Sequence, residues 1–148
     1  MRVSIKVKYG FASMICLAQK YNTGEYVTVL SLAERLKISK IYLEQVFSLL
    51  KRADLVSSIK GSRGGYQLAR PSNSITAFDI LSAIEVSLFE KSQESFIEGE
   101  NGIEKTIQNS VLEKLDASIK ATLLAISLES LVLDAQKYSS ENGYMFYL

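Results

Sequence analysis

Apolar positions recur at steps of three and four residues over most of the chain, which is the spacing of one face of an α-helix. This pattern predicts a first helix over residues 6–20 and a short second helix over residues 29–37, for which Thr28 is a plausible N-cap. A third helix is predicted over residues 40–54, with Ser39 placed to cap it. The N-terminal third of the chain is therefore expected to be helical.

The third helix carries a continuous apolar stripe that follows the i, i+3, i+4, i+7 pattern of a core-facing helix. Its members are Leu43, Val46, Phe47 and Leu50. The second and third helices are separated by about three residues, which are the proportions of a helix-turn-helix whose second helix enters the major groove of DNA. Helical pairs that pack only for stability are more common, so this spacing alone does not decide the function.

A change to β-favouring residues follows the third helix, in the segment LVSSIKGSRGGYQLA. Such residues on both sides of a glycine-rich tip predict a strand, a turn and a strand, with Val56, Ile59, Tyr66 and Leu68 in the strands. The tip carries Lys60 and Arg63, and basic side chains there can enter a narrow minor groove. By itself this is an ordinary surface hairpin; directly after a helix-turn-helix it is typical of a wing.

The C-terminal half is expected to hold a long helix that pairs two subunits. Thr76 and Asp79 form a capping-box-like pair at the start of a helix, and an acidic loop follows it. A long amphipathic helix is predicted over residues 103–125, and Ser127 would cap a further short helix. The apolar stripe of the long helix needs a partner surface, most simply the same helix of a second subunit; packing on its own domain is the alternative. The stripe consists of Ile107, Val111, Leu115, Ile119 and Leu123.

The composition is that of a soluble globular domain, since 47% of the 148 residues are apolar. The charge, however, is divided unevenly. Residues 1–70 contain 12 Lys or Arg and 4 Asp or Glu, a net charge of +8, whereas residues 71–148 contain 5 and 12, a net charge of −7. A basic half joined to an acidic half suggests a module that binds a polyanion, although a chance partition is the alternative.

Several classes of function find no support in the sequence. No apolar run is long enough to cross a bilayer, and charges interrupt the N-terminal pattern, so no membrane segment and no signal peptide are expected. The single cysteine cannot form an internal disulfide, which fits a reducing, cytoplasmic location. There is no histidine, no nucleophile–base pair and no phosphate-binding loop. We therefore expect no enzyme, no catalytic residue, no metal and no cofactor.

Four stretches of the sequence resemble the Rrf-two family of winged-helix transcription regulators. They are KYG at 8–10, ISKIYLEQVFSLL at 38–50, LVSSIKGSRGGYQLARP at 55–71 and ITAFDILSAIE at 75–85. The resemblance implies a mainly α-helical fold, a winged helix-turn-helix domain with a two-stranded wing plus a long C-terminal dimerisation helix. The expected units are a DNA-binding domain (1–86), an acidic loop (87–102), dimerisation helices (103–138) and a C-terminal tail (139–148).

The resemblance further implies a homodimer that binds double-stranded operator DNA and usually represses transcription. The start of the third helix would lie in the major groove, where Glu can accept a hydrogen bond from cytosine and Gln can pair with adenine. Lys60 corresponds to the wing residue that enters the minor groove, where arginine is the commoner choice. The expected DNA-binding residues are Ser39, Lys40, Ile41, Tyr42, Glu44, Gln45, Lys51, Lys60, Gly61, Arg63, Gly64 and Gly65.

The loop before the long helix departs from one branch of the family. Iron–sulfur members carry three cysteines there, and residues 90–102 contain none, so we expect no cluster. The chain is most similar to the cluster-free repressors of cysteine metabolism, which share its apolar, aromatic C-terminus. That branch implies a complex with O-acetylserine thiol-lyase (cysteine synthase), which captures a C-terminal aliphatic residue with its carboxylate. The expected partner-binding residues are Tyr144, Met145, Phe146, Tyr147 and Leu148.

Other interpretations stand beside this one. A repressor of the same family could control a different regulon and sense a small ligand, or redox state through Cys16. Cys16 falls on the predicted inner face of the first helix, which favours a buried core residue over a sensor. The tail could also pack on its own chain or on the sister subunit. Finally, the chain could be an interaction module that mainly regulates an enzyme through this tail.

Overall fold

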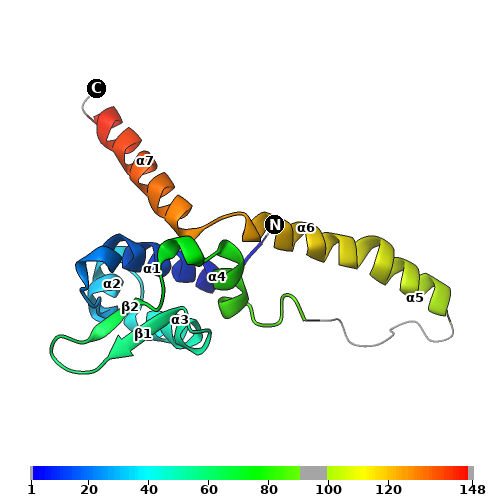
Figure 1. Ribbon diagram of the computed structural model, residues 1–148, viewed down its shortest axis with the longest axis horizontal. Coiled ribbons are helices and arrows are strands. Elements are labelled where there is room, and N and C mark those ends of the chain that lie inside the picture. Colours follow the sequence, from blue (N-terminus) through cyan, green and yellow to red (C-terminus); the bar gives the residue numbers. More distant parts are fainter. Residues whose placement is uncertain (1, 91–99, 147–148) are drawn as a thin grey trace.

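The fold is mainly helical and includes a two-stranded antiparallel sheet, as predicted (Figure 1). The computed structural model describes residues 2–90 and 100–146, with side chains up to residue 141 in the last helix. In chain order the elements are α1 (Ile5–Lys20), η1 (Tyr21–Thr23), α2 (Val29–Leu36), α3 (Lys40–Arg52), β1 (Val56–Ile59), β2 (Gly65–Leu68), η2 (Ser72–Ser74), α4 (Ala77–Ile84), α5 (Asn101–Ile107), the π-helical turn η3 (Gln108–Leu112), α6 (Glu113–Leu124) and α7 (Leu128–Phe146).

The core lies where α1, α3 and α4 pack together. Met14 of α1 and Ile80 of α4 are fully buried there, and so are the four residues of the α3 stripe, Leu43, Val46, Phe47 and Leu50. Burying an apolar side chain of this size stabilises a fold by roughly 1.5–3 kcal/mol. The stripe therefore fixes the rotation of α3 about its axis and decides which face of that helix stays in solvent.

Side-chain caps determine where α2, α3 and α4 begin. Thr28 and Ser39 each accept a hydrogen bond from a backbone N–H three residues further on, at 3.1 and 3.4 Å. At α4, Thr76 and Asp79 form a reciprocal capping box, in which the Asp79 carboxylate accepts from the Thr76 N–H at 2.9 Å. The predicted starts of these three helices are confirmed.

The wing is a hairpin that a third segment supports. β1 and β2 pair antiparallel, with Val56 opposite Leu68. Before α2, Val27 pairs with Tyr66 of β2, and each N–H donates to the other residue's carbonyl oxygen at 2.8 Å. The ring of Tyr66 also packs on Phe47 of α3, with centroids 4.5 Å apart. The wing is thus fixed to both the start of α2 and the middle of α3.

A long helical segment leaves this body after α4. It consists of α5, η3 and α6, and it begins at Asn101, two residues before the predicted start. The turn after α6 docks on the segment before α4: the Ala77 N–H donates to the Ile126 carbonyl oxygen, and the Leu128 N–H donates to the Ile75 carbonyl oxygen, both at 2.8 Å. Leu128 is fully buried. This junction anchors the long helices to the winged-helix body.

The last helix differs from the prediction. The sequence predicts a short helix after Ser127 and a separate tail over 139–148, but α7 continues to Phe146. No proline interrupts it, and its glycine, Gly143, lowers the stability of the helix by only about 1 kcal/mol relative to alanine. In Figure 1 the C-terminal end of α7 lies far from the body formed by α1–α4. Residues 139–146 therefore extend a helix that is rooted in the core.

Candidate nucleic-acid interface

The outer face of α3 remains largely in solvent because the core stripe occupies the opposite face. Ile41, a large apolar side chain, is 71% exposed on this face. An aliphatic side chain on such a face can contact the methyl group of thymine. The other predicted α3 residues that are exposed are Ser39, Lys40, Glu44, Gln45 and Lys51.

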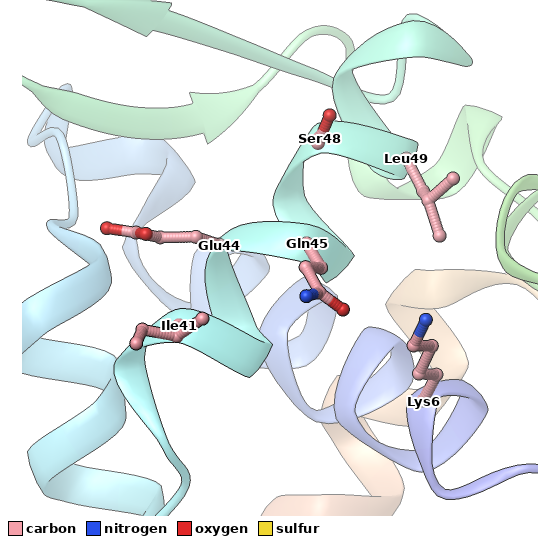
Figure 2. A pocket seen from close by; sticks show the side chains of 6 residues that line it. All are labelled: Lys6, Ile41, Glu44, Gln45, Ser48 and Leu49. Atoms are coloured by element: carbon pink, nitrogen blue, oxygen red, sulfur yellow. The ribbon is translucent and has the colours of Figure 1, made fainter.

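A shallow groove of about 490 Å³ runs along this face (Figure 2). Most of its lining comes from α3, but one residue, Lys6, comes from the first turn of α1. The lining residues are Lys6, Ile41, Glu44, Gln45, Ser48 and Leu49. The groove therefore presents amide, carboxylate, hydroxyl and ammonium groups together, which is the mixture of donors and acceptors that reads base edges and phosphates.

Two of the predicted DNA-binding lysines already have partners within the chain. Lys40 and Glu44 form an i,i+4 ion pair at 3.9 Å. Because both side chains are more than half exposed, such a pair contributes only about 0.3–0.5 kcal/mol and is easily exchanged for a contact with DNA. Lys51 donates a hydrogen bond of 2.7 Å to the Ser58 hydroxyl oxygen, which joins the end of α3 to β1.

Tyr42 has a structural role in addition to its predicted one. It is half-buried, and its ring meets that of Tyr9 edge to face, with centroids 5.4 Å apart and an interplanar angle of 88°. The Lys6 ammonium lies 5.6 Å from the centroid of the Tyr42 ring. Tyr42 therefore joins α3 to the first half of α1.

The wing tip presents two basic side chains to solvent. Lys60 and Arg63 are exposed, and within residues 2–90 and 100–146 neither takes part in an ion pair. Gly64 is buried in the turn, where a Cβ atom would collide with the carbonyl oxygen of Ile59. Gly64 thus shapes the tip, while the charged side chains are available to a ligand.

Lys6 and Ser48 are two groove residues that the sequence analysis did not select. Ser48 lies four positions after Glu44 on α3, so helical spacing could have placed it on the same face. Lys6 lies more than thirty residues before α3, and no local pattern relates the two segments. Only the packing of α1 against α3 brings Lys6 to the groove.

The predicted dimer stripe is solvent-exposed along its first half. Ile107, Val111 and Leu115 are 40%, 56% and 53% exposed in the single chain. Ile119 is half-buried, and Leu123 packs against the core of its own domain. The free apolar surface therefore lies on η3 and the neighbouring parts of α5 and α6, away from the body.

The remaining predicted residues lie at α1 and at the end of the chain. Tyr144, Met145 and Phe146 form the last turn of α7, whereas Tyr147 and Leu148 lie outside the described residues. Cys16 is buried in α1, and burial raises the pKa of its thiol, an effect that the nearby Arg35 charge partly opposes. A raised pKa leaves less of the reactive thiolate at neutral pH.

Across the described residues, no helix combines the length and the apolar character needed to cross a bilayer. In the same part of the chain, no group of three or more His, Cys, Asp or Glu side chains is placed to hold a metal ion.

The comparison with protein families finds a match over residues 3–134. It is the Rrf2 family, described as an iron-dependent transcriptional regulator. The residues of this chain do not fit a thiolate-ligated iron–sulfur centre, because its one cysteine is buried in the α1 core and it has no histidine.

Similar proteins include regulators of two kinds. The chain is 32% identical to CymR of Bacillus subtilis strain 168 over 148 residues, which is 100% of both chains. It is 41% identical over 86 residues to IscR of Cereibacter sphaeroides, a match that spans 57% of this chain and 56% of that protein. Among solved structures, IscR of T. potens has a TM-score of 0.73 at 37% identity and covers 99% of this chain and 97% of that one. The predicted winged-helix fold with a long C-terminal helix is confirmed by these likenesses.

Proposed function

Because the chain belongs to the Rrf2 family of DNA-binding transcriptional regulators, we propose that it is a dimeric repressor of genes of cysteine or sulfur metabolism. The observation that carries the DNA-binding part is the free outer face of α3 beside a basic wing tip. Both belong to the segment of residues 1–70, whose net charge is +8. A segment with such an excess of basic side chains attracts a phosphate backbone.

In the proposed complex, α3 lies in the major groove and the wing lies over the adjacent minor groove. Glu44 and Gln45 are exposed on α3, where they can contact base edges, and Ile41 can contact a thymine methyl group. Lys60 and Arg63 extend from the wing toward the minor groove, whose negative potential attracts them. Residues on α3 then supply the base preference, and the wing adds affinity that depends on groove width.

The dimer is proposed from the exposed stripe on η3, α5 and α6. Large apolar side chains that stand in water on a helix far from their own core favour association with another surface. The same helix of a second copy supplies a matching surface by two-fold symmetry. A two-fold dimer would present its two α3 helices to two half-sites of a palindromic operator.

The link with cysteine metabolism rests on CymR, a relative that this chain matches over its full length. A solved structure of that protein is described as the global cysteine regulator of B. subtilis. We propose that the end of α7, from Tyr144 onward, docks on cysteine synthase. The support from the fold is that α7, up to Phe146, leads away from the winged-helix body, so that an enzyme could bind its end without touching α3.

Cys16 is the weaker alternative as a sensor. Burial in the α1 core separates its thiol from soluble oxidants, and the raised pKa lowers the fraction of thiolate. IscR proteins are also among the relatives, and a regulon other than cysteine metabolism is the outcome to consider if the enzyme does not bind.

Replacing Lys60 with alanine tests the DNA-binding proposal. Duplexes selected from a random pool by the wild-type protein provide the ligand, and fluorescence anisotropy measures the affinity from low to high salt. The wild-type affinity should fall steeply as the salt concentration rises. Lys60→Ala should bind about tenfold more weakly, and its slope of log affinity against log salt concentration should be smaller by about 1. Lys137→Ala, which removes an exposed lysine of α7, is the matched control and should leave the slope unchanged. A wild-type affinity that hardly responds to salt would contradict the proposal.

Deleting residues 146–148 tests the enzyme partner. The truncated protein should lose binding to cysteine synthase in a pull-down with the purified enzyme, while sedimentation shows the same oligomeric state as the full chain. Tyr138→Ala is the control, because it removes an exposed aromatic ring from the same helix but lies outside the docking segment. If the truncated protein still binds the enzyme, or if its oligomer dissociates, the segment is not an enzyme-docking element.

A further inference from the structure

We propose that the DNA interface extends onto the first turn of α1, where Lys6 binds a backbone phosphate beside the major groove that receives α3. This inference rests on the proposed DNA-binding function and adds to it a contact outside both the helix-turn-helix and the wing. It starts from the groove on the outer face of α3, to which α1 contributes only Lys6.

The Lys6 ammonium lies close to an aromatic ring of α3. It lies 5.6 Å from the centroid of the Tyr42 ring, which attracts a cation to its face. Tyr42 is itself held by the edge-to-face contact with Tyr9 of α1. Two aromatic rings thus hold the start of α1 against α3, and the Lys6 side chain lines the groove.

The charge of Lys6 is not neutralised within the described part of the chain. No ion pair there includes it, and the first turn of α1 contains no acidic residue. Glu44, the carboxylate that also lines the groove, is paired with Lys40. In Figure 2 the Glu44 side chain extends to the opposite side of α3 from Lys6, whereas the Gln45 carboxamide points toward the side where Lys6 lies.

The dimensions of DNA indicate a phosphate as the ligand. An α-helix with its side chains is about 10–12 Å wide, and the major groove is about 12 Å wide, so a helix fills the groove. A group that flanks the helix then faces the sugar–phosphate backbone at the edge of the groove. Lys6 flanks α3 in this way. An ammonium group is a compact point charge with three donors, which suits a phosphate without selecting a base.

The simpler explanation is that Lys6 only stabilises the contact between α1 and α3 through the Tyr42 ring. That role predicts an effect on the stability of the fold, which DNA and salt would not alter. A phosphate contact predicts an effect on DNA affinity that depends on salt and is the same for all sequences. The first explanation therefore predicts a change in the stability of the fold, and the second predicts a change in the salt dependence of DNA affinity.

The test compares Lys6→Ala, Lys6→Arg and Lys8→Ala in anisotropy titrations with a selected duplex and with a random duplex, each over a range of salt concentrations. Lys6→Ala should bind both duplexes about tenfold more weakly, with a slope of log affinity against log salt reduced by about 1. Lys6→Arg keeps the charge and should keep the wild-type slope. Lys8 is exposed and is turned by about 200° around α1 from Lys6, so Lys8→Ala should behave as the wild type.

Thermal unfolding of each variant without DNA measures how much Lys6 contributes to the stability of the fold. If Lys6→Ala binds with the wild-type slope, or if Lys8→Ala lowers the slope equally, the phosphate contact is refuted. A loss of affinity for the selected duplex alone would also refute it, because a phosphate contact is blind to sequence. If the wild-type protein itself shows no salt-dependent binding, the proposed function fails first, so the two failures are distinguishable.

Discussion

Replacing Leu115 with glutamate is expected to convert the proposed dimer into monomers. Leu115 is 53% exposed on α6 in the single chain, in the middle of the apolar stripe that a second copy would cover. By two-fold symmetry each substitution occurs twice in one dimer. Each removes about 1.5–3 kcal/mol of apolar burial and places a carboxylate in a dry interface, at a cost of several kcal/mol. The dissociation constant of the dimer should therefore rise by at least about a thousandfold.

Analytical ultracentrifugation over a range of concentrations measures this change, and Ala117→Glu is its matched control. Ala117 is exposed on the same helix and is turned by about 200° from Leu115, so the same charge is placed on the opposite face. Ala117→Glu should remain a dimer. The Leu115 variant should also bind a palindromic duplex much more weakly, since each monomer reads only one half-site. A Leu115→Glu protein that sediments as the wild type would show that this stripe is not the interface.

Replacing Gly65 with alanine is expected to disrupt the wing. Gly65 has φ +137°, and a Cβ atom there would lie 2.6 Å from the carbonyl oxygen of Val27. That oxygen accepts the Tyr66 N–H hydrogen bond at 2.8 Å, so Val27 cannot withdraw without breaking the pairing that holds the wing to α2. We expect a loss of about 2–4 kcal/mol in the free energy of unfolding, from backbone strain together with a steric collision.

Urea unfolding measures that loss, and Gly61→Ala separates its two causes. Gly61 also has positive φ, +113°, but a Cβ atom there would meet nothing within 4 Å. Gly61→Ala should therefore cost only the strain, about 1 kcal/mol. DNA affinity should fall for Gly65→Ala because the wing and the start of α2 no longer keep their relative position. Equal stabilities for the two variants would mean that the contact with Val27 does not constrain the wing.

Much of the DNA-binding domain was predictable because its signals are local. The caps Thr28, Ser39 and Thr76 lie within three residues of the N–H groups that they bind, so the sequence alone places the starts of α2, α3 and α4. The stripe of α3 repeats with the helical period, and its burial follows from that period.

Three features were not predicted from the sequence. The length of α7 was not predicted, because Asn142 and Gly143 form a pair typical of turns, yet the helix continues through them to Phe146. The groove residue Lys6 was missed because its place beside Gln45 results from the packing of α1 on α3. Likewise, no sequence pattern near Tyr66 predicts its pairing with Val27.

The sequence by itself determined the helical character of the chain, the hairpin with its basic tip, the inner face of α3 and the division of charge between the two halves. Each of these is set by residues within one or two helical turns of one another, or by composition. Only the tertiary structure decided that Lys6 shares a groove with α3, that Val27 supports the wing, and that Ile126 and Leu128 anchor the long helices to the segment before α4. Burial of a common core brings these pairs together. That burial depends on the whole chain, so no periodic pattern in the sequence predicts which distant residues will meet.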